Sequence, residues 1–239
     1  MASSARALSI SYYFDFACPW CYLGFSRFHH ALKLSRVRGK IAYHPYELYA
    51  HNSSHRVEME KITTHLHLPR VYAQISPLAA REGIIIHQPS IFASSRRALT
   101  GFLFAQREKK EKEYLAHVFA AQFERGEDIS SLVTLGKIAH ELKWDIEKFL
   151  NFIQNPRNAN EIAIRSENAS REGITGVPTY RIGDFPIVGS FPSAELAAVF
   201  QQRAAEKEAP AFMDVSLHPT RTRTASRNKR AQKKSKKKS

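Results

Sequence analysis

The segment FDFACPWCYLGF, residues 14–25, contains both cysteines of the chain, Cys18 and Cys21, with Pro19 and Trp20 between them. Two cysteines at this spacing are typical of a redox-active pair, of part of a metal site, or of two buried apolar thiols. The residues on either side of the pair favour the first of these, because they predict a strand, a turn and a helix in that order.

Apolar residues alternate before the cysteine pair and follow it at helical spacing. The alternation predicts a strand with one buried face, formed by Leu8, Ile10, Tyr12 and Phe14. Pro19 suits the first residue of a helix, where its missing N–H is not needed. The helix is predicted to bury Tyr22, Phe25, Phe28 and Leu32. A second strand is expected at residues 40–48, so the cysteines lie on the first turn of a β-α-β unit.

The cellular compartment bears on what the two cysteines do. The N-terminus shows no secretory signal and the chain has no apolar run long enough to cross a membrane, which predicts an intracellular and most simply cytoplasmic protein. In a reducing compartment a close cysteine pair is more typical of redox or metal chemistry than of a structural disulfide. Zinc needs about four ligands, and only His29 and His30 follow nearby, so no metal site is predicted.

The net charge of +14 comes mainly from the C-terminus. Residues 219–239 contain ten Lys and Arg and no acid, which leaves +4 for the 218 residues before them. A basic run without apolar periodicity is expected to be disordered. Such a tail is typical of segments that contact nucleic acid or an anionic surface, or that direct a protein to the nucleus or another organelle. A solubilising extension without a specific partner is an equally good interpretation.

Helical and strand patterns divide the rest of the chain. Amphipathic helices dominate from residue 56 onward, with a serine in DISSLVTLGKIAHEL (128–142) and Asp145 as predicted N-caps. Strands return at residues 179–182 and 185–188, and Ser193 is predicted to cap a last helix. The predicted class is α/β, a thioredoxin-like fold with an inserted all-helical domain and a disordered basic tail. Its predicted parts are a thioredoxin-like domain in two pieces (1–55 and 159–208), a helical insertion (56–158) and the tail (209–239).

Three segments in this order resemble a known family. They are CPWCYLG (18–24), GEDISSLVTLGKIAHEL (126–142) and NASREGITGVPTYRIGDFPIVGS (168–190). Together they resemble the DsbA-like thioredoxin domain, especially its intracellular FrnE-type branch, over roughly residues 8–205. The resemblance implies thiol-disulfide oxidoreduction, with Cys18 as the nucleophile, Cys21 as the resolving cysteine and Pro178 as the facing cis-proline.

The resemblance also places supporting residues around the cysteines. In this fold the backbone of Val177 lies where an extended peptide or glutathione pairs with it. From their own chemistry, Pro19 is expected to stiffen the turn, and the uncharged Trp20 is expected to make the pair less strongly oxidising than in members with histidine there. Where many members have Asn-Thr followed two residues later by Ala-His, this chain has other side chains, including Arg96 and Arg97. These two arginines and Thr179 are candidate substrate-binding residues; a solvated helix face is the alternative for the arginines.

Three classes of function follow. The leading prediction is a dithiol-disulfide oxidoreductase or isomerase acting on protein or small-molecule disulfides, with no tightly bound cofactor and glutathione as a candidate co-substrate. The second is a glutathione-dependent transferase or isomerase, because kappa-class glutathione transferases and 2-hydroxychromene-2-carboxylate isomerases resemble the same fold. The third is a non-enzymatic scaffold with a nucleic-acid-binding tail. A homodimer is compatible with all three.

Overall fold

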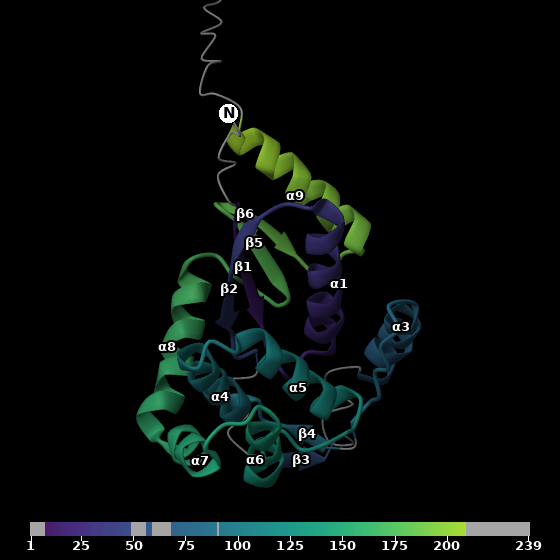
Figure 1. Cartoon of the computed structure of the whole chain (residues 1–239). Coiled ribbons are helices and arrows are strands. Elements are labelled where there is room, and N and C mark those ends of the chain that lie inside the picture. The colour runs from purple at the N-terminus through teal and green to yellow at the C-terminus, as the bar shows by residue number, and fades with distance from the viewer. Residues whose placement is uncertain (1–7, 49–55, 59–67, 90, 209–239) are drawn as a thin grey trace, which may run out of the picture. The chain divides into compact units, whose positions relative to one another are not determined.

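The computed structural model describes residues 8–48, 56–58, 68–89 and 91–208, which belong to one compact unit ending at Glu208 (Figure 1). The strands are β1 (Leu8–Phe14), β2 (Gly39–Pro45), β3 (Arg56–Glu58), β4 (Ile91–Ala93), β5 (Thr179–Ile182) and β6 (Phe185–Val188). The helices are α1 (Pro19–Ser35), α3 (Leu68–Arg81), α4 (Arg96–Arg107), α5 (Glu111–Phe123), α6 (Leu132–Glu141), α7 (Ile146–Gln154), α8 (Pro156–Arg171) and α9 (Ser193–Glu208). The predicted tail lies outside the described residues.

A four-stranded sheet in the order β2-β1-β5-β6 forms the centre of this unit. β1 runs parallel to β2 and antiparallel to β5, and β5 and β6 form a hairpin whose turn contains Gly183 at φ 60°. α1 packs against α9, where the rings of Phe28 and Phe200 lie 5.9 Å apart, while α8 contacts β2 (Figure 1). This arrangement confirms the predicted thioredoxin-like α/β fold.

The alternation in β1 separates two apolar layers, as predicted. Leu8, Ile10, Tyr12 and Phe14 are buried in the main core. Tyr13 points to the other layer, where it packs in a small cluster with Ala169 and Ile174. The last three residues of the strand, Tyr12 to Phe14, are therefore covered on both faces, which fits their aromatic character, whereas Ser9 near its start is exposed.

The segment expected to be entirely helical contains a short two-stranded sheet. β3 and β4 pair antiparallel, with Arg56 opposite Ala93 and Glu58 opposite Ile91. The prediction of an all-helical insertion is corrected here, because strands of three residues are too short to show an alternating pattern. Pro77 lies inside α3.

Side-chain caps were predicted with mixed success. The side chain of Ser131 accepts a hydrogen bond from the Val133 amide at the start of α6, and Asp145 accepts one from the Lys148 amide at the start of α7. These two caps are confirmed. The cap predicted at Ser193 is wrong, since Ser193 is itself helical and its buried hydroxyl has no hydrogen-bond partner among the described residues.

An aromatic cluster connects the sheet to the helices that follow it. The Phe14 ring lies 5.0 Å from that of Phe102 in α4, and the Phe16 ring lies 5.1 Å from that of Phe119 in α5. Buried aromatic pairs of this kind stabilise beyond their area alone. One core therefore extends from β1 into the helical segment. The domain boundary predicted at residue 158 falls within α8 (Pro156–Arg171), and the division into domains stays a prediction.

None of the helices in the described ranges combines the length and the apolar character needed to span a bilayer.

Replacing Gly101 in α4 tests the packing of the helical segment. A Cβ at this position would lie 2.9 Å from Cζ of Tyr114 and 3.0 Å from Cζ of Phe149, both fully buried. We expect Gly101→Ala to lower the free energy of unfolding by about 1–3 kcal/mol, as overpacking does, measured by urea denaturation. Gly136→Ala is the matched control, because its Cβ would make only ordinary contacts, at 3.7 Å or more. Equal stability of both variants would contradict this packing.

Candidate active site

The turn between β1 and α1 carries both cysteines. Cys18 stands directly before the helix with an extended backbone (φ −96°, ψ 111°), and Pro19 is the first helical residue. The Cys21 amide donates to the Cys18 carbonyl at 3.0 Å, which closes the first turn. The first N–H groups of a helix have no partner within the helix, so Cys18 lies beside unpaired backbone donors.

Both cysteines are free thiols in a closely packed environment. Cys18 is 5% exposed and Cys21 is fully buried. Burial raises the pKa of the Cys21 thiol well above its ordinary value, and the neighbouring Cys18 raises it further. The hydroxyl of Tyr12 donates to the Cys21 carbonyl at 2.7 Å and so fixes the helix beside the second cysteine. Of the two thiols, Cys18 is therefore the one nearer to solvent and to an incoming group.

The segment before β5 lies beside Cys18, although Cys18 and Val177 are 159 residues apart in sequence. Sγ of Cys18 lies 3.6 Å from the carbonyl oxygen of Val177, and the Val177–Pro178 peptide bond is cis, as the resemblance implied. Thr179 is buried and its hydroxyl donates to the Gly176 carbonyl at 2.7 Å. The structure thus brings Cys18, Val177 and Pro178 together as the sequence predicted.

Gly24 in α1 permits this approach, and the sequence reasoning did not assign it a role. A Cβ on Gly24 would lie 2.8 Å from the hydroxyl oxygen of Tyr180 and 3.1 Å from Cγ of Pro178. The Tyr180 hydroxyl donates to the Gly24 carbonyl at 2.9 Å. The only sequence signal was a glycine inside an otherwise apolar helical pattern, which often marks close backbone packing.

Asp15 is a second residue that the sequence reasoning missed. Its carboxylate is fully buried and accepts hydrogen bonds from the amides of Ala17 (3.0 Å) and Leu48 (2.7 Å). Burial raises its pKa to about 6, against the lowering effect of those amides and of the Ser95 side chain. The sequence feature that could have indicated its role is an acidic residue within an apolar run. The bond from Ser95 also explains why this residue precedes α4 without capping it.

Residues 9–201 match the family model of the DSBA-like thioredoxin domain. The chain belongs to the DsbA-like thioredoxin domain family. A curated relative, the protein YwbO of Bacillus subtilis, is 28% identical over 76% of this chain and 90% of its own length.

Solved structures share the fold of this DsbA-like domain. A probable DsbA oxidoreductase from Streptomyces coelicolor has a TM-score of 0.76 at 19% identity, over 83% of this chain and 91% of that one. A 2-hydroxychromene-2-carboxylate isomerase has a TM-score of 0.63 at 21% identity, over 84% and 95%. The cytosolic disulfide reductase DsbM of Pseudomonas aeruginosa has a TM-score of 0.58 at 15% identity, over 84% and 97%.

The two arginines predicted to bind substrate have partners within the DsbA-like domain. Arg96 forms a two-pronged ion pair with Glu47, with Nε to Oε1 at 2.7 Å and Nη2 to Oε2 at 2.5 Å. Arg97 donates to the Ser130 carbonyl at 2.8 Å. Glu47 acts on Asp15 by raising its pKa, so Arg96 neutralises a second acid close to the active-site turn. Substrate contact by Arg96, Arg97 or Thr179 stays a prediction.

Trp20 is the one residue between the cysteines that is partly exposed. Its side chain packs against the main core and carries no charge. Within the described ranges, no three His, Cys, Asp or Glu side chains are grouped as metal ligands.

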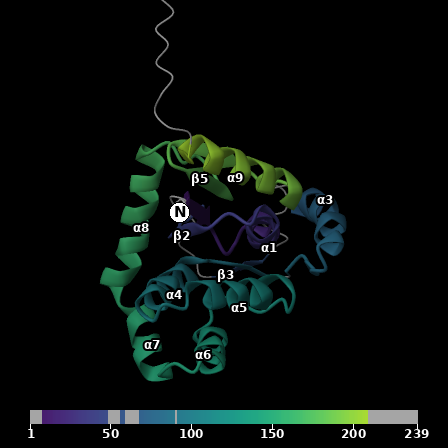
Figure 2. The same ribbon diagram turned by 45° about the horizontal axis from the view of Figure 1, so that its top comes forward.

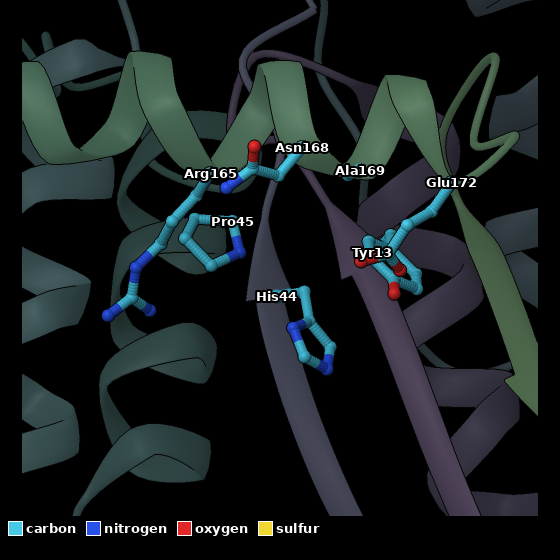
Figure 3. Close-up of a pocket in the computed structure, with 7 residues that line it drawn as sticks. All are labelled: Tyr13, His44, Pro45, Arg165, Asn168, Ala169 and Glu172. Carbon is cyan, nitrogen blue, oxygen red and sulfur yellow. The ribbon is translucent and has the colours of Figure 1, made fainter.

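A separate cavity of about 230 Å³ lies on the α8 side of the sheet. His44 projects into it between Arg165 and Glu172, and its ring stacks on Tyr13 at 4.6 Å (Figure 3). Arg165 pairs with Glu161, and Glu172 pairs with Arg181. Burial lowers the pKa of His44. Since Tyr13 faces away from the main core, this cavity is separated from the cysteines by the sheet.

Gly24→Ala tests whether close packing places Pro178 beside the cysteines. The added methyl would displace the Pro178 ring and the Tyr180 hydroxyl, so we expect a loss of about 1–3 kcal/mol in unfolding free energy and slower reaction of Cys18 with a disulfide. Both are measured on purified protein, by denaturation and by stopped-flow thiol exchange. Gly176→Ala is the control, since a Cβ there would meet nothing within 4 Å. A Gly24 variant indistinguishable from this control would contradict the assignment.

Asp15 predicts a distinct pH dependence of stability. Its pKa is about 6 in the folded protein and 3.8 ordinarily, so between these values the folded state holds a proton that the unfolded state has released. Its contribution to stability therefore falls as pH rises from about 4 to about 6, by roughly 3 kcal/mol in all. Asp15→Asn should remove this slope, measured as the difference in unfolding free energy between the two proteins across that range. Parallel pH profiles would contradict a raised pKa at Asp15.

Proposed function

We propose that this DsbA-like protein is a thiol-disulfide oxidoreductase in which Cys18 is the nucleophile and Cys21 the resolving cysteine. The observation that carries the proposal is the position of Cys18. It is a free thiol at the N-terminus of α1, 3.6 Å from the Val177 carbonyl, with a second free thiol on the same turn.

Two exchange steps transfer one electron pair. The Cys18 thiolate attacks a disulfide RS–SR′, forms the mixed disulfide Cys18–S–SR and releases R′S⁻. The Cys21 thiolate then attacks Sγ of Cys18, which forms the Cys18–Cys21 disulfide and releases RS⁻. The substrate gains two electrons and the two protons that the cysteines lose. The reverse sequence oxidises two substrate thiols, and isomerisation combines both directions.

The environments of the two cysteines fit different roles in this sequence. A nucleophile must be reached by the substrate, and Cys18, directly before α1, is the less buried of the two thiols. Burial raises the pKa of Cys21, so this thiol stays protonated while Cys18 reacts. The resolving step is then intramolecular and is favoured by proximity on one helical turn.

The backbone of Val177 is the proposed docking point for the substrate. Its carbonyl faces the Cys18 thiol, and an extended peptide or a glutathione moiety can form main-chain hydrogen bonds with such a segment. A solved structure of DsbM from Pseudomonas aeruginosa, with a TM-score of 0.55 at 15% identity, is described as being with GSH. This supports glutathione as a co-substrate for the proposed reaction, together with protein or small-molecule thiols and disulfides.

Action in the cytoplasm is part of the same proposal, supported by the description of DsbM as cytosolic. Homodimer formation and nucleic-acid contact by residues 209–239 stay predictions from the sequence.

Trapping of the mixed disulfide tests the two assigned roles. Reduced Cys21→Ser protein mixed with oxidised glutathione should accumulate one glutathione on Cys18, because nothing resolves the adduct. Cys18→Ser should react at least about tenfold more slowly, because the remaining thiol is buried. Intact-mass spectrometry after acid quench measures both rates, with the wild-type protein as the reference that closes its own disulfide.

Other results would point to the competing functions. Faster adduct formation on Cys21 than on Cys18 would reverse the assignment. Glutathione transfer to an electrophile that persists in Cys18→Ser protein would favour a transferase, and no reaction in any variant would leave the fold as a scaffold.

A further inference from the structure

Three exposed apolar side chains gather along one edge of the sheet. They are Phe185 and Val188 of β6 and Phe191, which follows this strand. All three line a groove of about 340 Å³ between β6 and the first half of α9. Figure 2 shows α9 at the outside of the described unit, as does Figure 1, and no described helix or strand lies beyond it. Apolar side chains that gather in this way on a surface mark an interaction site.

The backbone of β6 limits what this edge can bind. β6 is the last strand of the sheet, and in its hairpin with β5 alternate residues point their N–H and C=O groups inward. The Gly189 amide continues this pattern by donating to the Pro178 carbonyl at 2.8 Å. The outward groups of β6 therefore belong to Pro186 and Val188, and Pro186 has no N–H. An added strand would gain few hydrogen bonds here, so side-chain contacts decide what binds.

The two ends of the groove carry opposite charges. Glu195 lines the groove near the start of α9 and forms no hydrogen bond or ion pair with any residue that the structure describes. At the other end, Cζ of Arg203 lies 3.9 Å from the ring centre of Phe185. Val199 also lines the groove and is four residues from each charged residue on one side of α9. Each charge is therefore about 6 Å along the helix from Val199.

An aromatic ring accompanies each charge. The chain reverses between β6 and α9, so the start of β6 lies beside Arg203, while Phe191 lies close to the start of α9. The order along the groove is Phe185 with a cation, an apolar centre, and Phe191 with an acid. A half-turn about an axis near Val199 therefore places the acidic end of one copy on the cationic end of another.

Arg203 is able to form this additional contact. Its Nη1 pairs with Glu206 at 2.8 Å, and both side chains of this pair are partly exposed, so the pair itself contributes little stability. Nε and Nη2 of Arg203 donate to no group within the described ranges. Because a guanidinium has five donors, Arg203 can accept a second carboxylate without losing Glu206.

We propose that a second copy of this chain binds in this groove across a twofold axis near Val199, with Glu195 of each copy paired to Arg203 of the other. The contact buries Phe185, Val188 and Phe191 of both copies. A twofold contact closes on itself, so it gives a dimer and not a filament.

Reversing the two charges tests the reciprocal pairing. Glu195→Lys and Arg203→Glu each place like charges at both contacts of a homodimer, so each should weaken self-association at least about tenfold. An equimolar mixture of the two variants restores opposite charges at both contacts and should associate within about threefold of the wild type. Sedimentation velocity of the full chain measures this over roughly 1–100 μM at about 0.15 M salt. Reductant is present, so no disulfide between copies forms.

Matched variants separate this surface from general effects. Glu167→Lys makes the same charge change in an exposed pair with Arg171 on α8, and should leave self-association within about twofold. Val188→Ser should weaken it about tenfold, because the dimer buries this side chain once from each copy. Val133→Ser is its control, since Val133 is 69% exposed and lies in α6, outside the groove, against 55% for Val188.

Three results would overturn the proposal. They are a wild-type protein that is monomeric over the whole concentration range, equal weakening by Glu195→Lys and Glu167→Lys, and a mixture of the two reversed variants that associates no more tightly than either alone. A folding defect cannot produce the predicted rescue, because mixing does not repair it. Cys18→Ser protein should dimerise like the wild type, so failure of the redox proposal would leave this result unchanged.

Discussion

The packing of residues 178–180 against Gly24 holds the two halves of the candidate site together. Cys18 and Pro178 are far apart in sequence, and they meet because α1 offers a bare backbone where a side chain would otherwise stand. The Tyr180 hydroxyl is bonded to the Gly24 carbonyl and its ring stacks on Tyr12 at 5.2 Å. A position without Cβ thus sets the distance between the nucleophile and the backbone that faces it.

The buried carboxylate of Asp15 ties a third part of the chain to the same turn. It is held by one amide from the active-site turn and one from the segment after β2, and by the Ser95 side chain before α4. Burying an ionised acid is costly unless hydrogen bonds compensate. The pKa of Asp15 is raised, so these hydrogen bonds offset only part of the cost of burying its charge. Protonation of Asp15 is therefore coupled to the packing of the three segments that hold it.

Much of the architecture could be predicted from the sequence, because the apolar periodicity of each segment agrees with the capping residues and the proline at its ends. The alternation of β1, Pro19 at the start of α1 and the caps at Ser131 and Asp145 are local features, and the structure has them. β3 and β4 were missed because three-residue strands have no period. The roles of Gly24 and Asp15 were missed because they depend on groups distant in sequence, and the partners of Arg96 and Arg97 depend on tertiary packing for the same reason.

The redox equilibrium of the Cys18–Cys21 pair tests the central claim most directly. Wild-type protein is equilibrated in a series of glutathione buffers, quenched in acid, alkylated and weighed by intact-mass spectrometry. The account predicts one reversible two-electron transition in which both thiols lose their alkylation together, and which Cys18→Ser abolishes. If the two cysteines remain alkylated across the whole series, or titrate independently of one another, the pair is not a dithiol redox centre.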